Sequence, residues 1–118
     1  MLNAFPYTSG HVMIAPRAHV ARLDELGIAA AAEMMSLMQR LDTALRNLYS
    51  PDGLNFGMNL GRAAGAGIAN HIHMHALPRW FGDTSFITAT AETRVLPEAL
   101  EVTWERLRAE FGVPRSQA

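Results

Sequence analysis

The strongest constraint on the fold is a run of regularly spaced apolar residues between positions 28 and 48. The residues that recur there every three or four positions are Met34, Met38, Leu41, Leu45 and Leu48. This period matches one face of an α-helix, so the sequence predicts a long amphipathic helix over 28–48. The segment 50–53, Ser-Pro-Asp-Gly, follows directly and is typical of a turn that ends a helix.

The remaining pattern is typical of short strands. The segments 11–16 and 54–60 are apolar runs next to turn residues, and 68–78 alternates polar with apolar side chains, so we expect a strand at each. The residues expected on one face of the second strand are Leu54, Phe56, Met58 and Leu60. We also expect a short extended piece at 86–90 and a C-terminal helix over 96–111, with Pro97 near its first turn. The fold class is therefore α+β: a small antiparallel sheet with one long helix and a C-terminal helix.

Composition limits the functional classes. A chain of 118 residues with 49% hydrophobic and 18% charged residues predicts one globular domain. Its net charge of -1 gives no bulk attraction for nucleic acid or for an anionic membrane surface, so neither partner is expected. There are no cysteines and no apolar run that approaches the roughly 20 residues of a membrane span. We therefore expect a cytoplasmic protein.

Three histidines alternate with apolar residues in the third expected strand. His71, His73 and His75 would share one strand face at a spacing of roughly 6.5 to 7 Å. Neighbouring imidazoles can act on one bound group, one as nucleophile and others as donors, because histidine titrates near neutral pH. A zinc site is the competing interpretation, although three ligands along a straight strand converge on one ion with difficulty. A purely structural role fits three histidines on one face less well.

A glycine-rich segment over 61–67 precedes these histidines. Gly61, Gly65 and Gly67 free the backbone to turn N–H groups toward an anion. The segment lacks the lysine of a P-loop and precedes a strand, so it is weak evidence alone. Next to the histidines, it predicts a phosphoanhydride held by backbone amides and attacked by an imidazole.

These motifs resemble the histidine-triad superfamily. Its signature of histidines alternating with apolar residues and followed by two apolar residues stands at 71–77 as His-Ile-His-Met-His-Ala-Leu. A second landmark stands at 10–19 as Gly-His-Val-Met-Ile-Ala-Pro-Arg-Ala-His. The long helix, the Asn-Leu-Gly at 59–61 and the segment 78–83 are similar to the bacterial and archaeal branch that includes diadenosine polyphosphate phosphorylases and hydrolases. The resemblance covers nearly the whole chain.

The resemblance implies an enzyme that cleaves the phosphoanhydride of a dinucleoside polyphosphate through a nucleotidyl-histidine intermediate, as hydrolase or nucleotidyltransferase. His73 would be the nucleophile, flanked by His71 and His75, and His11 would complete the polar relay. The residues that it places at the substrate are Asn3, Asn59, Gly65, Ala66 and Gly67. Arg79 and Trp80 could also pair with or stack on substrate, or belong to the surface and an interface. We expect His19 to be structural or peripheral.

The resemblance also implies a two-fold homodimer and a nucleotide partner. The chemistry would need no cofactor, although the nucleotide could carry a divalent cation. The sequence departs from the family pattern in three places. Relatives often carry serine, threonine or glutamine where Ala66 and Gly67 stand, and a glutamate where Asn70 stands. Family members also usually begin some tens of residues earlier. We expect a single domain over 1–118 without the usual N-terminal strands. A zinc-dependent hydrolase and a non-catalytic nucleotide-binding module remain alternatives.

Overall fold

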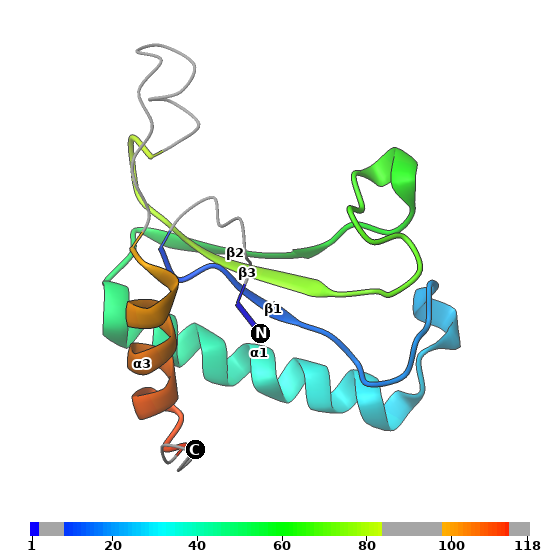
Figure 1. The fold of residues 1–118 in the computed structure, drawn as a ribbon, viewed down its shortest axis with the longest axis horizontal. Coiled ribbons are helices and arrows are strands. Elements are labelled where there is room, and N and C mark those ends of the chain that lie inside the picture. Colours follow the sequence, from blue (N-terminus) through cyan, green and yellow to red (C-terminus); the bar gives the residue numbers. More distant parts are fainter. Residues whose placement is uncertain (3–8, 84–97, 114–118) are drawn as a thin grey trace.

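A three-stranded antiparallel sheet packs against one long helix in the computed structural model (Figure 1), which describes residues 1–2, 9–83 and 98–113. The elements in chain order are β1 (Val12–Ile14), the 3-10 turn η1 (Leu23–Glu25), α1 (Ile28–Tyr49), β2 (Gly53–Met58), the 3-10 turn η2 (Arg62–Ala64), β3 (Met74–Arg79) and α3 (Leu100–Glu110). The strand order is β1-β3-β2, so β3 is central. The expected α+β fold is confirmed.

The strand register separates an apolar sheet face from a polar one. Ala76 of β3 lies opposite Val12 of β1 and Phe56 of β2, and all three belong to the core or pack against it. Because side chains alternate along a strand, His75 points to the opposite face. Helix α1 covers the apolar face (Figure 1), which leaves the face of His75 free of α1.

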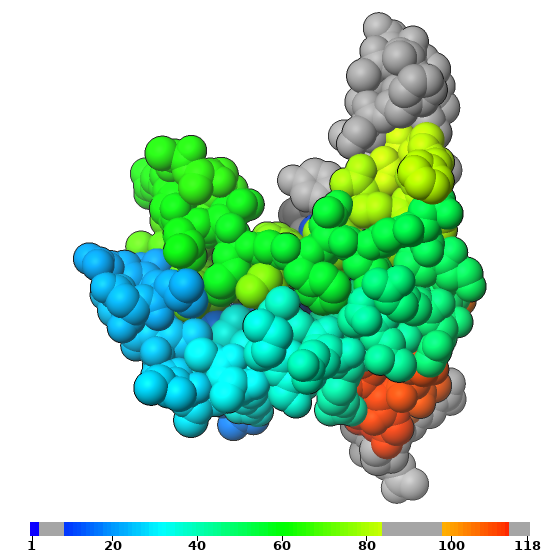
Figure 2. All heavy atoms as spheres, turned by 180° about the vertical axis from the view of Figure 1, so that it is seen from behind, coloured from blue at the N-terminus to red at the C-terminus, as the bar shows by residue number. Residues whose placement is uncertain are grey.

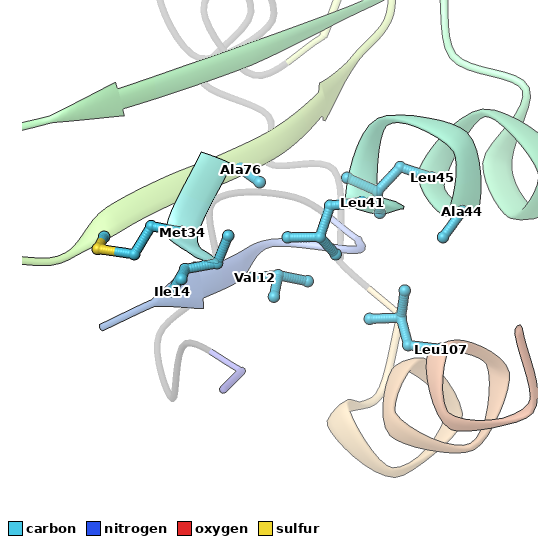
Figure 3. Packing of buried hydrophobic residues seen from close by; sticks show 8 residues of the cluster. All are labelled: Val12, Ile14, Met34, Leu41, Ala44, Leu45, Ala76 and Leu107. Atoms are coloured by element: carbon cyan, nitrogen blue, oxygen red, sulfur yellow. The ribbon is translucent and has the colours of Figure 1, made fainter. Parts of the chain in front are cut away.

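Helix α1 forms where the apolar period predicts it. Its buried residues Met34, Leu41, Ala44 and Leu45 meet β1, β3 and Leu107 of α3 in one core (Figure 3). Met38 and Leu48, also predicted on this face, are partly buried against the same core. The helix ends at Ser50, whose left-handed backbone (φ 44°, ψ 51°) closes a bond from its N–H to the Arg46 carbonyl. None of the described helices offers an apolar stretch long enough to cross a membrane.

The third strand is shorter than predicted. We expected it over 68–78 with all three triad histidines on it, but β3 begins at Met74 and includes only His75 of the three. Both neighbours stop at that point, since Ile14 of β1 and Met58 of β2 each pair with Met74. The residues before it have no strand partner in this sheet, and the Ile72 N–H instead donates to the Val20 carbonyl at 2.9 Å.

Two further boundaries differ from the prediction. The C-terminal helix was expected from position 96, but α3 begins at Leu100, after Ala99 with a non-helical ψ of 141°. Hydrogen bonds join Glu98, just before it, to Tyr49 and Ser9. Leu60, predicted to share the face of Leu54, lies beyond the end of β2 and is 41% exposed. The expected extended piece at 86–90 and Pro97 lie outside the described residues.

Candidate active site

The site begins with two histidines in contact, of which His11 is buried and His75 is half-buried. His11 lies one residue before β1 and is 1% exposed, and His75 lies in β3. Their Nε2 and Nδ1 atoms are 2.8 Å apart, a hydrogen-bond distance, and their ring centroids are 5.1 Å apart. The antiparallel pairing of β1 with β3 places them side by side although 64 residues separate them. The pair predicted from the resemblance is thus in direct contact.

Both imidazoles of this pair are held neutral. Burial, and to a smaller extent the charge that His75 would carry, lower the pKa of His11 from 6.5 to about 4. Burial and then His73 lower the pKa of His75. Each neutral ring carries one N–H and one lone pair, so the bond between them has one donor and one acceptor. At neutral pH the pair can relay a hydrogen bond without carrying a charge.

His73 is oriented by the backbone of its own segment. Its Nδ1 lies 3.0 Å from the carbonyl oxygen of His71. A carbonyl can only accept, so Nδ1 donates in this bond, and in the neutral form of the ring Nε2 then carries the lone pair. The His73 ring lies edge-on to that of His75, with 4.9 Å between centroids. The arrangement presents an unprotonated imidazole nitrogen beside a second imidazole.

His71 has a different environment. Its Nε2 donates to the Pro16 carbonyl at 2.7 Å, which ties the triad segment to the chain that follows β1. The ring of His19 packs on it with 4.4 Å between centroids. We expected His19 to be structural or peripheral, and the structure gives it direct contact with a triad member. The sequence feature that could have indicated this contact is the position of His19 at the end of the segment 10–19, the second landmark.

The glycine-rich loop stands beside the open face of the sheet. In Figure 2 it forms a lobe, and the molecule is hollowed between this lobe and the turn that follows β3. Gly65 has a left-handed backbone (φ 89°), and its N–H donates to the Arg62 carbonyl, while that of Ala66 donates to the Gly61 carbonyl. Those two amides are therefore used within the loop, not turned toward an anion. Asn59 reaches the loop, since its Nδ2 lies 3.9 Å from the position of a Cβ on Gly65.

Arg79 and Trp80 lie at the far end of β3 from His73. The Arg79 guanidinium forms an ion pair with Asp83, which raises the pKa of Arg79, and donates to the Asn55 side chain at 2.9 Å. Trp80 is half-buried. These contacts place Arg79 in a local ion pair, in keeping with its surface interpretation. Asn3, which the resemblance places at the substrate, lies outside the described residues.

The competing zinc interpretation finds no converging ligand set. Among the described residues, no group of three or more histidine, aspartate or glutamate side chains is placed to hold a metal ion. A catalytic zinc site needs three such ligands.

An apolar cavity of about 330 Å³ lies elsewhere, along the outer edge of β1 and against α1 and α3. Its lining includes Val12, Ile14, Leu41 and Leu107, and no histidine. These residues belong to the core, which α1 and α3 share with the apolar sheet face. The cavity is therefore separate from the histidine site.

Comparison with known proteins agrees with these motifs. A sequence model of the HIT domain matches residues 1–82. A Mycobacterium tuberculosis protein named AP-4-A phosphorylase is 39% identical over 112 residues, which are 95% of this chain and 57% of that protein. The chain thus spans little more than half the length of this relative.

Solved structures also match. A zinc-bound histidine triad family protein from Mycobacterium smegmatis is 31% identical, with a TM-score of 0.73 over 94% of this chain and 75% of that one. A Plasmodium falciparum diadenosine triphosphate hydrolase, 18% identical, has a TM-score of 0.71 over 94% of this chain and 66% of that one, and so shares the fold.

Proposed function

Because this chain belongs to the HIT domain family, we propose that it cleaves the phosphoanhydride of dinucleoside polyphosphates through a covalent intermediate on His73. The observation that carries the proposal is the bond from Nδ1 of His73 to the His71 carbonyl, which leaves Nε2 unprotonated. A nucleophile needs such a lone pair, and the backbone supplies it without another acidic or basic side chain. The substrate class is supported by the name of the 39% identical relative, AP-4-A phosphorylase.

In the first step, the Nε2 lone pair of His73 bonds to the α-phosphorus. The bond to the bridging oxygen breaks, and its electron pair leaves with the polyphosphate. The product would leave as an anion at neutral pH without prior protonation, since the second pKa of a phosphate is about 6. The site therefore has to stabilise charge, which positioned hydrogen-bond donors can do.

We assign His75 the role of such a donor. If His11 donates from Nε2 to Nδ1 of His75, then His75 carries its own proton on Nε2 and can donate to a phosphate oxygen. The lowered pKa values of both rings keep each ring neutral at neutral pH, which this arrangement of protons requires. We assign His11 the role of fixing the tautomer of His75, and His71 the role of holding the segment that carries His73.

In the second step, an oxygen of water or inorganic phosphate attacks the same phosphorus, and an attacking water loses a proton to solvent. The nitrogen–phosphorus bond breaks, and its electron pair returns to Nε2 of His73. From diadenosine tetraphosphate, the first step releases ATP; water as acceptor then gives AMP, and phosphate gives ADP. Because the Gly65 and Ala66 amides bond within the loop, Gly67, Asn59 and Asn3 are the residues that would contact the nucleotide, which could carry a divalent cation.

The test is to incubate the metal-stripped protein with diadenosine tetraphosphate, with and without phosphate, and to separate the products by chromatography. We expect AMP and ATP, or ADP and ATP when phosphate is present, and loss of turnover with retained nucleotide binding in His73→Ala. Gln39→Ala, on the exposed side of α1, is the matched control and should keep full activity. Equal turnover by His73→Ala would refute the covalent step. Binding without turnover in the wild type would support a nucleotide-binding module instead.

We also propose a homodimer. Strand β2 forms an edge of the described sheet, with β3 on its one paired side, and an open edge can pair with a second copy. Light scattering over a range of concentrations tests this, and a monomer at every concentration would refute it.

A further inference from the structure

A cluster of polar side chains joins the ends of the two helices, away from the histidines. Its centre is Glu98, two residues before α3. Tyr49, the last residue of α1, donates its hydroxyl to Glu98 Oε2 at 2.5 Å, and Thr103 donates to the same oxygen at 2.7 Å. Arg106 donates to the other oxygen at 2.7 Å. The Glu98 carboxylate thus accepts hydrogen bonds from three side chains of two helices.

The cluster is charged, and its side chains are hydrogen-bonded to one another. The side chain of Glu98 is 16% exposed, and Thr103 is 2% exposed. Arg106 lies over the Tyr49 ring at 4.4 Å and also donates to the Leu48 carbonyl. Burial would raise the pKa of Glu98, but its three hydrogen bonds and the charge of Arg106 lower it below its usual value. Burial, with the bond to Glu98, raises the pKa of Tyr49 to about 12.

The backbone of Glu98 connects this cluster to the chain that leads into the histidine site. The Glu98 N–H donates to Ser9 Oγ at 2.6 Å, a contact between residues 89 positions apart. Gly10 follows with φ 78°, and a Cβ there would lie 3.0 Å from both Pro78 Cγ and Tyr49 Cε2. The turn at Ser9 and Gly10 is therefore held from one side by Glu98 and from the other by Pro78 and Tyr49.

His11 is the next residue. Its ring is fully buried, and its bond to His75 is 2.8 Å long, so its position depends on the turn that precedes it. We propose that Glu98 is a positioning residue for the His11–His75 pair, acting through its backbone bond to Ser9. The side-chain bonds to Tyr49, Thr103 and Arg106 fix Glu98, and Glu98 fixes the turn. The expected effect of Glu98 on turnover rests on the proposed function, whereas its effect on the position of His11 does not.

The experiment compares four variants of the full chain. Ser9→Ala removes the acceptor, Ser9→Thr keeps a hydroxyl, and Glu98→Gln removes the charge that binds Arg106. Glu101→Gln, at an exposed glutamate in the first turn of α3, is the control. The first readout is the nitrogen-15 NMR titration of the His11 and His75 imidazoles, which needs no catalysis. The second is kcat and KM for diadenosine tetraphosphate.

We expect Ser9→Ala and Glu98→Gln to raise the pKa of His11 from about 4 toward 6.5, as its ring loses its buried contact. We expect kcat to fall about ten- to a hundredfold with little change in KM, as for a misplaced catalytic group. Ser9→Thr should restore both values, and Glu101→Gln should change neither.

The inference is overturned if Ser9→Ala and Glu98→Gln fold but leave the His11 titration unchanged, whatever their activity. Should Glu98→Gln fail to fold, the inference is tested by comparing the His11 titration of Ser9→Ala with that of Ser9→Thr. A wild type without turnover would refute the proposed function, whereas the NMR titration would still support or overturn the role of Glu98.

Discussion

Replacing His11 by glutamine should make the fold less sensitive to acid. The pKa of His11 is about 4 in the folded protein and 6.5 in an unfolded chain, so only the unfolded state takes up this proton between those pH values. Above pH 6.5 the contribution of the neutral ring is fully present, and it is lost as the pH falls toward 4. Glutamine has no such titration, and its amide can still donate toward His75.

The size of the change in unfolding free energy follows from the interval between the two pKa values of His11. Each pH unit costs about 1.4 kcal/mol, so the interval between pH 6.5 and 4 corresponds to roughly 3 kcal/mol of unfolding free energy. His11 is 1% exposed, so solvent screens this effect little. His75, whose pKa is also lowered, adds an acid-sensitive contribution in both proteins.

The measurement is urea denaturation followed by circular dichroism, at several pH values between 7 and 4, for the wild type and His11→Gln. The difference between the two unfolding free energies should shrink as the pH falls, and the variant should have the shallower pH dependence. Glu98 titrates in both proteins and so cancels in the comparison. Parallel curves would show that folding does not lower the pKa of His11, and would refute a His11 ring that stays neutral down to about pH 4.

Three further substitutions test the packing. Leu45→Ala, at a residue with 0% exposure, should lower the unfolding free energy by about 2 to 5 kcal/mol in urea titrations, and a loss below that range would mean that the cavity collapses. Ser50→Gly should raise the unfolding free energy by about 1 kcal/mol, and with it the melting temperature, because glycine adopts the left-handed backbone at the end of α1 without strain. An unchanged melting temperature would show that Ser50 is not strained. Gly10→Ala should destabilise the fold by about 1 to 3 kcal/mol, because its φ is 78° and its Cβ would meet Pro78 and Tyr49; a neutral result would mean that the turn can shift freely.

Local sequence spacing was sufficient to predict α1 and the two faces of β3, because both depend on residues close together in the chain. The apolar period predicted α1 closely, because helix formation and burial of one face both follow from residues three and four positions apart. Leu41 and Leu45 were identified as core residues for the same reason. Strand alternation likewise predicted that Ala76 and His75 point to opposite faces of the sheet.

The extent of the third strand depended on its partners. Alternation of histidine with apolar residues continues through the triad in the sequence, but a strand exists only where another strand supplies hydrogen bonds. Both neighbours end opposite Met74, so His71 and His73 take backbone contacts of their own. The difference bears on the chemistry, since it allows His73 Nδ1 to reach the His71 carbonyl.

The sequence by itself determined the fold class and the apolar face of the long helix, and it identified the histidines proposed to carry the chemistry, because each follows from short-range spacing and side-chain type. Tertiary structure decided which nitrogen of His73 keeps its lone pair, how deeply His11 is buried against His75, and how Glu98 reaches Ser9. These depend on contacts between segments up to 89 positions apart, and on the desolvation that follows from burial. No local pattern carries that information, because it arises only when the strands and helices pack together.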